Sequence, residues 1–488
     1  MTRKAVPVAV IGAIILAVWS VTLGNGFVYD DHKYLLGNPW VKDAAFIGDI
    51  FSSSTAAFSP SDAVSNTYRP LLFTLYLSEY LAFGPSPFYF HLVNVLAHAV
   101  NAALVFLVAM SLFEKEGRSR VLPAMFAGLA FGLHTVNSEV VNWVSASTEL
   151  FFTLFLLAGL NLYLRRQSGW LSAPFFLAAL LFKETAAALP ILVFLFDLSR
   201  EALLRARWKA YSLFIVAGLV YAVMRLNAIG GIMHHKQISL TFFETVINIF
   251  PLVSAYSAKL VFPAGLSVIY DFHPARSVFD LRVLSGAAIV MAFCGALFLA
   301  RKRPSFFIGL SMMAVPLLPV LYVPALSSSA MADRYLYLPS AGLAIVLASL
   351  AARLDAKAAK ASIAVAIALL VAWGAGSVAR SRVWKSDYEL WADAVKKAPY
   401  SPNAHYNYAW ASRNAGNLKD AIEHYRRAGE IAPSADVHYS LGLIFMSQSM
   451  IDEADSEFRA ALALDPAFEQ ARARLMEIKN LRHSDRDF

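Results

Sequence analysis

Apolar residues along this chain fall into long runs separated by short polar connections, a pattern typical of α-helical membrane proteins. A helix needs about 20 apolar residues to cross a hydrocarbon layer of about 30 Å. We predict about eleven membrane spans, near residues 5–24, 90–113, 121–137, 147–164, 169–182, 185–198, 210–226, 283–300, 305–325, 335–352 and 361–379. The fifth and sixth runs are short for a full crossing. The predicted fold class is therefore all-α, a polytopic membrane helical bundle.

Positive charges alternate along this pattern. Every second connection is short and basic, and its cations are Arg3 and Lys4; Lys115, Arg118 and Arg120; Arg165 and Arg166; Arg200, Arg205, Arg207 and Lys209; Arg301, Lys302 and Arg303; and Arg353, Lys357 and Lys360. Cytoplasmic loops of membrane proteins carry such an excess of Lys and Arg. The N-terminus is then predicted to be cytoplasmic, and an odd number of spans places the C-terminus outside.

The connections on the opposite side are longer. Residues 25–89 and 227–282 form two predicted external loops, and each contains an apolar stretch, 70–83 and 240–262. The first stretch is too short to span and is predicted to be a helix lying on the interface. The second is long enough to span, but a re-entrant or interfacial helix preserves the charge pattern.

The last hundred or so residues contain an internal repeat. Residues 402–433 and 435–466 align with a constant spacing of 33, pairing Ala409 with Gly442, Ala421 with Ala454, Tyr425 with Phe458, Ala428 with Ala461 and Pro433 with Pro466. Small residues, an aromatic residue and proline at these offsets resemble the tetratricopeptide repeat (TPR). We predict two domains, a membrane domain over 1–380 and a periplasmic domain over 381–488 of about two and a half repeats, closed by a capping helix over 467–482.

Composition narrows the classes of function. The chain is 58% hydrophobic and 16% charged, with a mean hydropathy of +0.54, which excludes an ordinary soluble protein. The net charge of +8 is explained by cytoplasmic loops, so no nucleic-acid partner is expected. The single cysteine, Cys294, excludes an intrachain disulfide and a cysteine-based metal site. The motifs of Walker ATPases, zinc proteases of the His-Glu-x-x-His type and Gly-x-Ser-x-Gly hydrolases are absent from the sequence.

Ionisable residues gather beside the predicted outer ends of the spans. Charged groups in or beside a membrane span are energetically unfavourable, so their presence there suggests a function. Asp30 and Asp31 follow the first span. Neighbouring residues in an extended segment point in opposite directions, so one aspartate is free to face a cavity while the other fixes the loop or binds a cation. Whichever aspartate faces the cavity is a candidate general base for an acceptor hydroxyl. The alternative is a solvated loop with helix-capping aspartates.

Histidines and a glutamate add polar groups near the same side. His91, Asn94, His98 and Asn101 share one helical face, which favours interhelical hydrogen bonds over a metal site. The second external connection runs from His134 to Glu149. Within it, Glu139 is the second carboxylate that we place in the cavity.

Three cations at this side are candidates for holding a phosphate. Lys183 lies next to Glu184, and either the two form an ion pair or Lys183 meets a phosphate. Arg69 precedes the interfacial helix. Arg334 opens the tenth span, where its planar guanidinium can grip an anionic headgroup. The alternative for Arg334 is snorkelling to the interface or pairing with Asp333.

These segments together resemble the GT-C membrane glycosyltransferases, and most closely the transmembrane-and-TPR-repeat-containing O-mannosyltransferase-like family. The resemblance covers nearly the whole chain in the same order. The matching segments are F-V-Y-D-D-H-K-Y-L-L-G-N at 27–38, Y-R-P-L at 68–71, H-L-V-N at 91–94 with His98, His134 through Glu139, Lys183-Glu184 with Pro190, and D-R-Y-L-Y-L-P-S at 333–340. The chain departs from the family's animal members in having few TPRs, which implies a short acceptor groove.

The resemblance implies a polyprenyl-phosphate-linked sugar as donor, used at the periplasmic face of the cell inner membrane. The acceptor is a protein, glycan or lipid hydroxyl, guided by the TPR domain. Asp30 would be the base, with Asp31 as its support or substitute. The remaining implied roles are donor or acceptor orientation for Glu139, phosphate binding for Arg334, Lys183 and Arg69, and lining of the acceptor cavity for His91, His98, His134, Glu184 and Tyr335. One inverting displacement without an obligatory metal or other cofactor is expected, a divalent cation being left open.

Two rival hypotheses follow from the same pattern. In the first, the membrane part anchors a non-enzymatic scaffold whose TPR domain recruits a periplasmic partner. So many spans exceed what an anchor requires, and the external carboxylates would lack a purpose. In the second, the chain is a transporter, against which the sequence shows no matched pair of transmembrane repeats.

Overall fold

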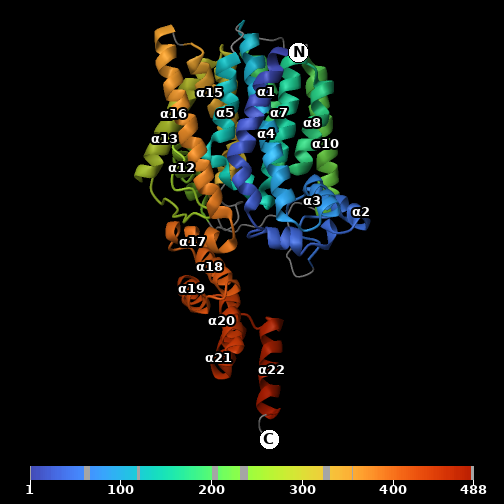
Figure 1. Cartoon of the computed structure of the whole chain (residues 1–488), viewed down its shortest axis with the longest axis vertical. Coiled ribbons are helices and arrows are strands. Elements are labelled where there is room, and N and C mark those ends of the chain that lie inside the picture. The colour runs from blue at the N-terminus through green and yellow to red at the C-terminus, as the bar shows by residue number, and fades with distance from the viewer. Residues whose placement is uncertain are drawn as a thin grey trace. The chain divides into compact units, whose positions relative to one another are not determined.

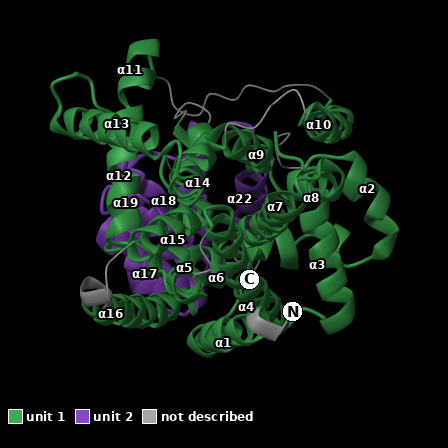
Figure 2. Ribbon diagram, turned by 90° about the horizontal axis from the view of Figure 1, so that it is seen from above, with its two compact units in different colours: residues 1–266, 273–385 green, residues 267–272, 386–488 purple. Residues whose placement is uncertain are grey.

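The computed structural model describes residues 2–59, 66–117, 121–200, 207–230, 240–321, 330–353 and 356–484, and every regular element in these ranges is helical (Figure 1). The chain divides into two compact units, coloured in Figure 2. The membrane unit comprises residues 1–266 and 273–385, and the repeat unit comprises residues 267–272 and 386–488. Among the predicted features, Arg118, Arg120, Arg205 and residues 322–325 lie outside the described residues.

The membrane unit consists of long helices joined by short turns. Its main helices are α1 (Thr2–Trp19), α2 (Ile47–Ser52), α3 (Pro70–Phe83), α4 (Pro87–Lys115), α5 (Val121–Leu133), α6 (Ser138–Asn142), α7 (Ser147–Arg166), α8 (Gly169–Phe182), α9 (Ala188–Ser199), α10 (Trp208–Ile229), α11 (Phe242–Ile247), α12 (Ile249–Val261), α13 (Leu281–Ala300), α14 (Pro304–Ala314), α15 (Tyr337–Ala351) and α16 (Ala356–Ser381). Short helical turns extend several of them, including η1 (Ser20–Gly24) after α1 and η11 (Asp333–Leu336) before α15. The prediction of an all-helical polytopic bundle is confirmed.

Eight helices of the described chain are long and apolar enough to cross a membrane on their own. A ninth crossing is counted if α5 and the turn that continues into α6 form one span, bent by 44°. The helices α8 and α9 coincide with the two short predicted runs. At 1.5 Å per residue they measure about 21 and 18 Å, less than the hydrocarbon thickness.

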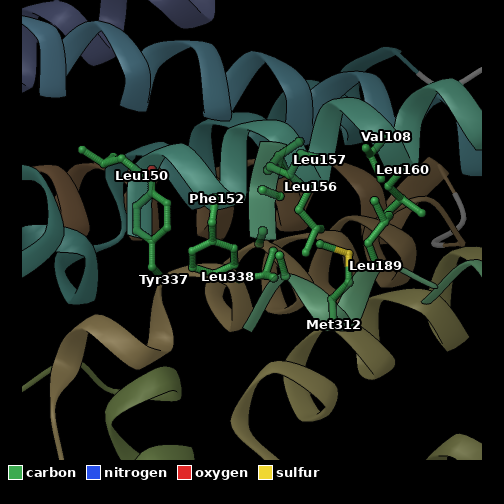
Figure 3. Packing of buried hydrophobic residues seen from close by; sticks show 14 of the residues in the cluster. Val108, Leu150, Phe152, Leu156, Leu157, Leu160, Leu189, Met312, Tyr337 and Leu338 are labelled. Carbon is green, nitrogen blue, oxygen red and sulfur yellow. The ribbon is translucent and has the colours of Figure 1, made fainter. Parts of the chain in front are cut away.

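The centre of the bundle is apolar. Helix α7 packs against α4 and α8, and α14 packs against α15. Figure 3 shows Leu156 and Leu157 of α7 in the same buried apolar cluster as Met312 of α14 and Leu338 of α15. Gly342 permits the close approach of α14 and α15, because a Cβ atom there would lie 2.5 Å from the Gly309 carbonyl oxygen. Small residues are the usual means of bringing helices together in a membrane.

The two predicted external loops contain the short apolar helices expected there. Helix α3 covers the predicted stretch 70–83, and the stretch 240–262 divides into α11 and α12. Thr241 and Glu244 form a capping box at the start of α11. Helix α12 is 13 residues long, about 20 Å, and packs on α13.

The repeat unit is a stack of helix pairs. It contains α17 (Asp387–Lys397), α18 (Pro402–Asn414), α19 (Leu418–Ile431), α20 (Ala435–Ser447), α21 (Ile451–Leu464) and α22 (Glu469–Ser484). The repeated positions form its core: Ala409, Tyr425 and Phe458 are fully buried. A Cβ atom on Gly442 would lie 2.6 Å from a ring carbon of Phe458, so glycine lets the second aromatic residue fill this position.

Candidate functional site

The turn after the first span is fixed by Asp31. Its side chain is fully buried, and its carboxylate accepts hydrogen bonds from the backbone N–H of Val28 (3.1 Å) and from the N–H and Oγ of Ser145 (2.7 and 2.6 Å). Burial raises the pKa of Asp31 to about 7, although these hydrogen bonds favour the charged form. Asp31 therefore ties the loop after α1 to the turn before α7 and supports its neighbour.

Asp30 is the half-buried member of the pair. Burial raises the pKa of its carboxyl group, and the guanidinium of Arg334, followed by the ammonium of Lys33, opposes that shift. The backbone before it is strained: Tyr29 has a φ of +55°, a left-handed conformation that bulky residues rarely adopt. Such strain persists where the surroundings determine it, and it is common at functional sites.

Arg334 is held in place by Glu139. Its Nη1 donates to Glu139 Oε1 at 2.6 Å, and its backbone N–H donates to Glu139 Oε2 at 3.3 Å. The Glu139 side chain is 2% exposed, whereas the Arg334 side chain is 22% exposed. The carboxylate is thus an anchor with both oxygens engaged, and the guanidinium keeps an accessible side.

Aromatic rings surround this ion pair. The Arg334 guanidinium lies 5.4 Å from the ring centre of Trp143 and 5.1 Å from that of Tyr335. Trp143 in turn stacks between Tyr29, at 5.4 Å, and Trp384, at 6.1 Å. The rings shield the cation from water on these sides and fix its direction, which strengthens its interaction with any anion.

A hydrogen-bonded cluster joins the helix ends that carry these groups. The Asn142 side chain accepts from Thr22 Oγ1 (3.0 Å) and Asn25 Nδ2 (2.9 Å) and donates to Ser381 Oγ (3.0 Å). These residues come from the ends of α1, α6 and α16. Because buried polar groups are costly without partners, the cluster specifies how the three ends meet.

Lys183 lies near Arg334, because both side chains contact the ring of Tyr335, but its ammonium already has a carboxylate partner. Its ammonium forms a buried ion pair with Glu149, and it lies 4.9 Å from the ring centre of Tyr335. Tyr335 is therefore flanked by Lys183 and Arg334. One of the two predicted alternatives was an ion pair between Lys183 and Glu184. In the structure Lys183 pairs with Glu149 instead, and Glu184 lies near Arg225.

Glu184 belongs to a second basic cluster. Its carboxylate lies 3.7 Å from Arg225 Nε, and Arg225 Nη2 also donates to the Asn66 carbonyl oxygen at 2.8 Å. Arg69, directly before α3, is within electrostatic reach of Tyr221, which also interacts with Glu184 and Arg225. Arg69 thus lies with Arg225 rather than in direct contact with Arg334.

The three predicted cavity-lining histidines are buried in the bundle. His91 Nε2 contacts the Gly26 carbonyl oxygen at 3.2 Å, His98 contacts the Tyr337 hydroxyl at 2.8 Å and the Gly132 carbonyl at 2.9 Å, and His134 contacts the Leu260 carbonyl at 3.0 Å. Their exposure is at most 1%. In the structure these histidines hold neighbouring segments of the bundle together, and for His91 and His98 this matches the alternative of structural hydrogen bonding. Among the described residues, no group of three metal-ligating side chains is placed to hold an ion.

An apolar groove of about 660 Å³ runs along α1, α5 and α16. Its walls include Ile14, Leu129 and Val371, and the cation Arg382 lies among its lining residues just after α16. Arg382 is two residues from Trp384, which stacks on Trp143. The groove therefore leads along the membrane-spanning helices toward the cluster that contains Arg334.

The repeats match the family model "Tetratricopeptide repeat" at residues 402–435 and 435–468, which confirms the predicted TPRs. Over 84% of its length the chain is 25% identical to the protein O-mannosyl-transferase F38B6.6 of Caenorhabditis elegans. Over 86% of its length it is 26% identical to the protein O-mannosyl-transferase TMTC4 of Mus musculus. The chain is similar to protein O-mannosyl-transferases. The predicted resemblance to that family is thereby confirmed.

These O-mannosyl-transferase relatives are longer than the chain. It spans 61% of the worm protein and 65% of the mouse protein. A shorter match, 33% identical over 192 residues, relates 38% of the chain to 22% of the O-mannosyl-transferase Tmtc1 of Drosophila melanogaster. Among solved structures, ArnT from Cupriavidus metallidurans bound to undecaprenyl phosphate aligns with 89% of the chain at 16% identity and a TM-score of 0.39, covering 80% of that chain. A TM-score this low does not establish a shared fold.

Several residues of the cluster were not predicted as site residues. Trp143 lies next to Arg334 and stacks on Trp384, but the two tryptophans are far apart in sequence, and tryptophans near span ends are common at interfaces. Arg225 had a usable signal, because it is a cation within the apolar run 210–226. Arg382 lies in a basic stretch after the last span, where a charge on the outer side departs from the usual pattern.

Proposed function

We propose that the chain is a membrane glycosyltransferase that transfers a sugar from a polyprenyl-phosphate donor to an acceptor hydroxyl. The observation that carries this proposal is that a half-buried carboxylate, Asp30, lies within electrostatic reach of a guanidinium, Arg334, that Glu139 orients. These groups come from positions 304 residues apart, so their meeting is a property of the fold. A scaffold would have no need of a base facing an anion-binding group.

Asp30 is proposed as the general base. Its raised pKa makes it a better proton acceptor than an ordinary carboxylate, and the charge of Arg334 opposes that rise in pKa. Asp31, with both oxygens bound, positions Asp30. In one inverting displacement, the acceptor hydroxyl would lose its proton to Asp30 as its oxygen bonds to the anomeric carbon and the lipid phosphate departs.

Arg334 is proposed to bind the departing phosphate. A phosphate is already a good leaving group, so the protein mainly has to align the reactants and stabilise the charge on the leaving oxygens. Glu139 holds the guanidinium before the donor arrives, which removes the cost of orienting it. No obligatory metal is needed in this scheme, because Arg334 supplies the positive charge, with Arg69 and Arg225 as further cations near α3.

The apolar groove is proposed to hold the isoprenoid chain of the donor. Its walls are aliphatic, it follows the spanning helices, and Arg382 lies where a phosphate would meet the outer end. Such a site would leave the sugar near Trp143 and Asp30. The groove thus supports a donor whose sugar is carried on a long membrane lipid.

The relatives' names suggest mannose as the sugar and protein hydroxyls as the first acceptors to test. The two TPRs would then guide the acceptor, since stacked helix pairs present an extended surface. The alternating basic connections support an inner-membrane location with a cytoplasmic N-terminus and a periplasmic repeat unit. The active site would consequently face the periplasm.

The decisive experiment replaces Asp30 by Asn in the purified full-length chain and measures mannose transfer from a polyprenyl-phosphate donor. Transfer is expected to fall by about 10²–10⁴-fold, the usual contribution of a general base. Asp49→Asn, which removes an exposed carboxylate of the same external loop, is the matched control and should leave the rate unchanged. Wild-type transfer by a folded Asp30→Asn variant would refute the assignment.

A further inference from the structure

A basic pocket lies at the end of the bundle away from Asp30 and Arg334. Its volume is about 470 Å³, and its lining residues are Lys115, Glu116, Ser199, Arg200, Lys302, Arg303, Pro304 and Arg353. Five of these residues are cations and one is a carboxylate. The pocket contains no residue of the candidate site described above.

The helices themselves place this pocket at the opposite end. Arg334 lies at the beginning of the candidate span Asp333–Ala351, and Arg353 lies just after its end. Likewise α9 begins after Lys183 and ends at Ser199, a lining residue. At 1.5 Å per residue the 19-residue span separates the two sites by about 28 Å.

Among the described residues, the one carboxylate that lines the pocket has hydrogen-bond and ion-pair partners of its own. Glu116 Oε1 accepts from the backbone N–H and the Oγ of Ser305, at 2.8 and 2.7 Å, and so caps the start of α14. Its Oε2 lies 3.7 Å from Arg353 Nη2 and orients that guanidinium. Glu116 therefore helps to build the pocket, and the described residues that line it are five cations and one carboxylate, an excess of positively charged side chains around a concave space.

Basic loops are ordinarily explained by membrane topology, because cytoplasmic loops are rich in Lys and Arg. Carbonyl groups at the C-terminal ends of helices also attract cations. Arg200 is an example, since its Nη1 donates to the Lys115 carbonyl oxygen at 3.0 Å. Topology accounts for cations in each connection taken alone. It does not require cations from four separate connections, those after α4, α9, α13 and α15, to line one pocket.

We propose that this pocket binds a phosphate group, and that an anionic membrane lipid presents it. The lining residues lie at the ends of membrane-spanning helices, which is the depth of lipid headgroups. Clustered Lys and Arg at this depth attract anionic headgroups by charge and by hydrogen bonds to phosphate oxygens. This site is independent of the proposed transfer reaction.

The test titrates phosphatidylglycerol into the detergent-purified full chain and follows the midpoint of thermal unfolding, with phosphatidylcholine and inorganic phosphate as parallel titrants. The variant is Lys302→Gln combined with Arg303→Gln. The control is Arg165→Gln combined with Arg166→Gln, which removes two exposed cations at the same end but outside the pocket. We expect the apparent affinity for phosphatidylglycerol to fall about 30-fold in the first variant and to stay unchanged in the control.

The outcomes are distinct. Stabilisation by phosphatidylglycerol that is lost only in the Lys302/Arg303 variant supports the proposal. If only inorganic phosphate gives this pattern, the pocket binds phosphate, but the ligand is a soluble phosphate and not a lipid. Equal stabilisation of both variants, or equal stabilisation by phosphatidylcholine, would overturn it. If the double variant fails to fold, Arg303→Gln alone is expected to weaken binding about fivefold.

Discussion

At the scale of single residues, the structure distinguishes two adjacent aspartates that the residue pattern alone did not tell apart, although the family resemblance implied Asp30 as the base. Asp31 is fully buried and bound by Val28 and Ser145, whereas Asp30 is half-buried and faces Arg334. The sequence-based expectation that the two would point in opposite directions assumed an extended segment, whereas residues 29 and 30 form a turn and Asp31 has helical backbone angles. That expectation did not predict which would be which, because that depends on Ser145, more than a hundred residues away in the sequence.

The pKa of Asp30 gives a test at this scale. Lys33 holds that pKa down, second to Arg334, so Lys33→Gln should raise it. The base must be ionised, and its activity is lost as the pH falls through its pKa. The acidic limb of kcat/KM should therefore move to higher pH in Lys33→Gln, while Lys42→Gln in the same loop should leave it in place. A limb that stays fixed or moves to lower pH in Lys33→Gln would argue against Asp30 as the titrating base.

Glu139 offers a second test of a single side chain. The sequence suggested that it orients donor or acceptor, whereas both its oxygens are bound to Arg334. Glu139→Gln keeps the shape but removes a charge-assisted hydrogen bond, worth roughly 1.5–3 kcal/mol. We expect kcat/KM for the donor to fall by about one to two orders of magnitude on that basis. Steady-state kinetics with varied donor concentration measures this, and unchanged kinetics would show that Arg334 needs no anchor.

At the scale of elements, the apolar runs predicted the bounds of several helices but not the bends within the spans. Helices α3 and α8 have the predicted bounds of 70–83 and 169–182, because continuous apolar runs end at clear turn signals. The 44° bend between α5 and α6 was not predicted. It begins at His134, whose ring accepts from the Val136 backbone and contacts Leu260, so its cause is partly a tertiary contact.

The proposal that the groove along α16 holds the isoprenoid chain of the donor can be tested by a substitution in that helix. A Cβ atom on Gly374 would meet only Leu133, at an ordinary 3.9 Å, so a larger side chain there should fill the groove without disturbing the fold. Gly374→Leu is expected to raise KM for a long-chain polyprenyl donor severalfold and to spare a donor with a short isoprenoid chain. Transfer assays with both donors make the comparison.

Gly218 in α10 supplies the matched control for that experiment. A Cβ atom there would meet nothing within 4 Å, and α10 contributes no residue to the groove. Gly218→Leu makes the same chemical change in another helix and should leave both donors unaffected. Equal losses with long and short donors in Gly374→Leu would point to a general distortion of α16 and would contradict the proposed lipid site.

At the scale of the whole molecule, the TPRs could be predicted from a local sequence repeat, whereas the candidate site is assembled from residues far apart in the sequence. The TPRs were visible because their contacts recur at a fixed spacing of 33, as Tyr425 and Phe458 show. The candidate site brings residues 30, 139 and 334 together through packing of several helices. No local pattern encodes that meeting, and only the resemblance to a family suggested it.

Topology is the whole-molecule property on which the proposed reaction depends. The proposed topology, which rests on the alternating basic connections, has residues 33 and 400 on one side of the membrane and residue 166 on the other. With Cys294 replaced by Ser, the chain has no other thiol, so single cysteines at Lys33, Tyr400 and Arg166 can be probed separately with a membrane-impermeant maleimide. All three side chains are exposed.

In intact cells with a permeabilised outer membrane, Lys33→Cys and Tyr400→Cys should be labelled, and Arg166→Cys should react only after the inner membrane is opened. Labelling of residue 33 without residue 400 would leave the site outside but place the repeat unit on the cytoplasmic side, where it would not guide a periplasmic acceptor. Labelling of residue 166 but not of residue 33 would put Asp30 in the cytoplasm and reverse the direction of the proposed transfer.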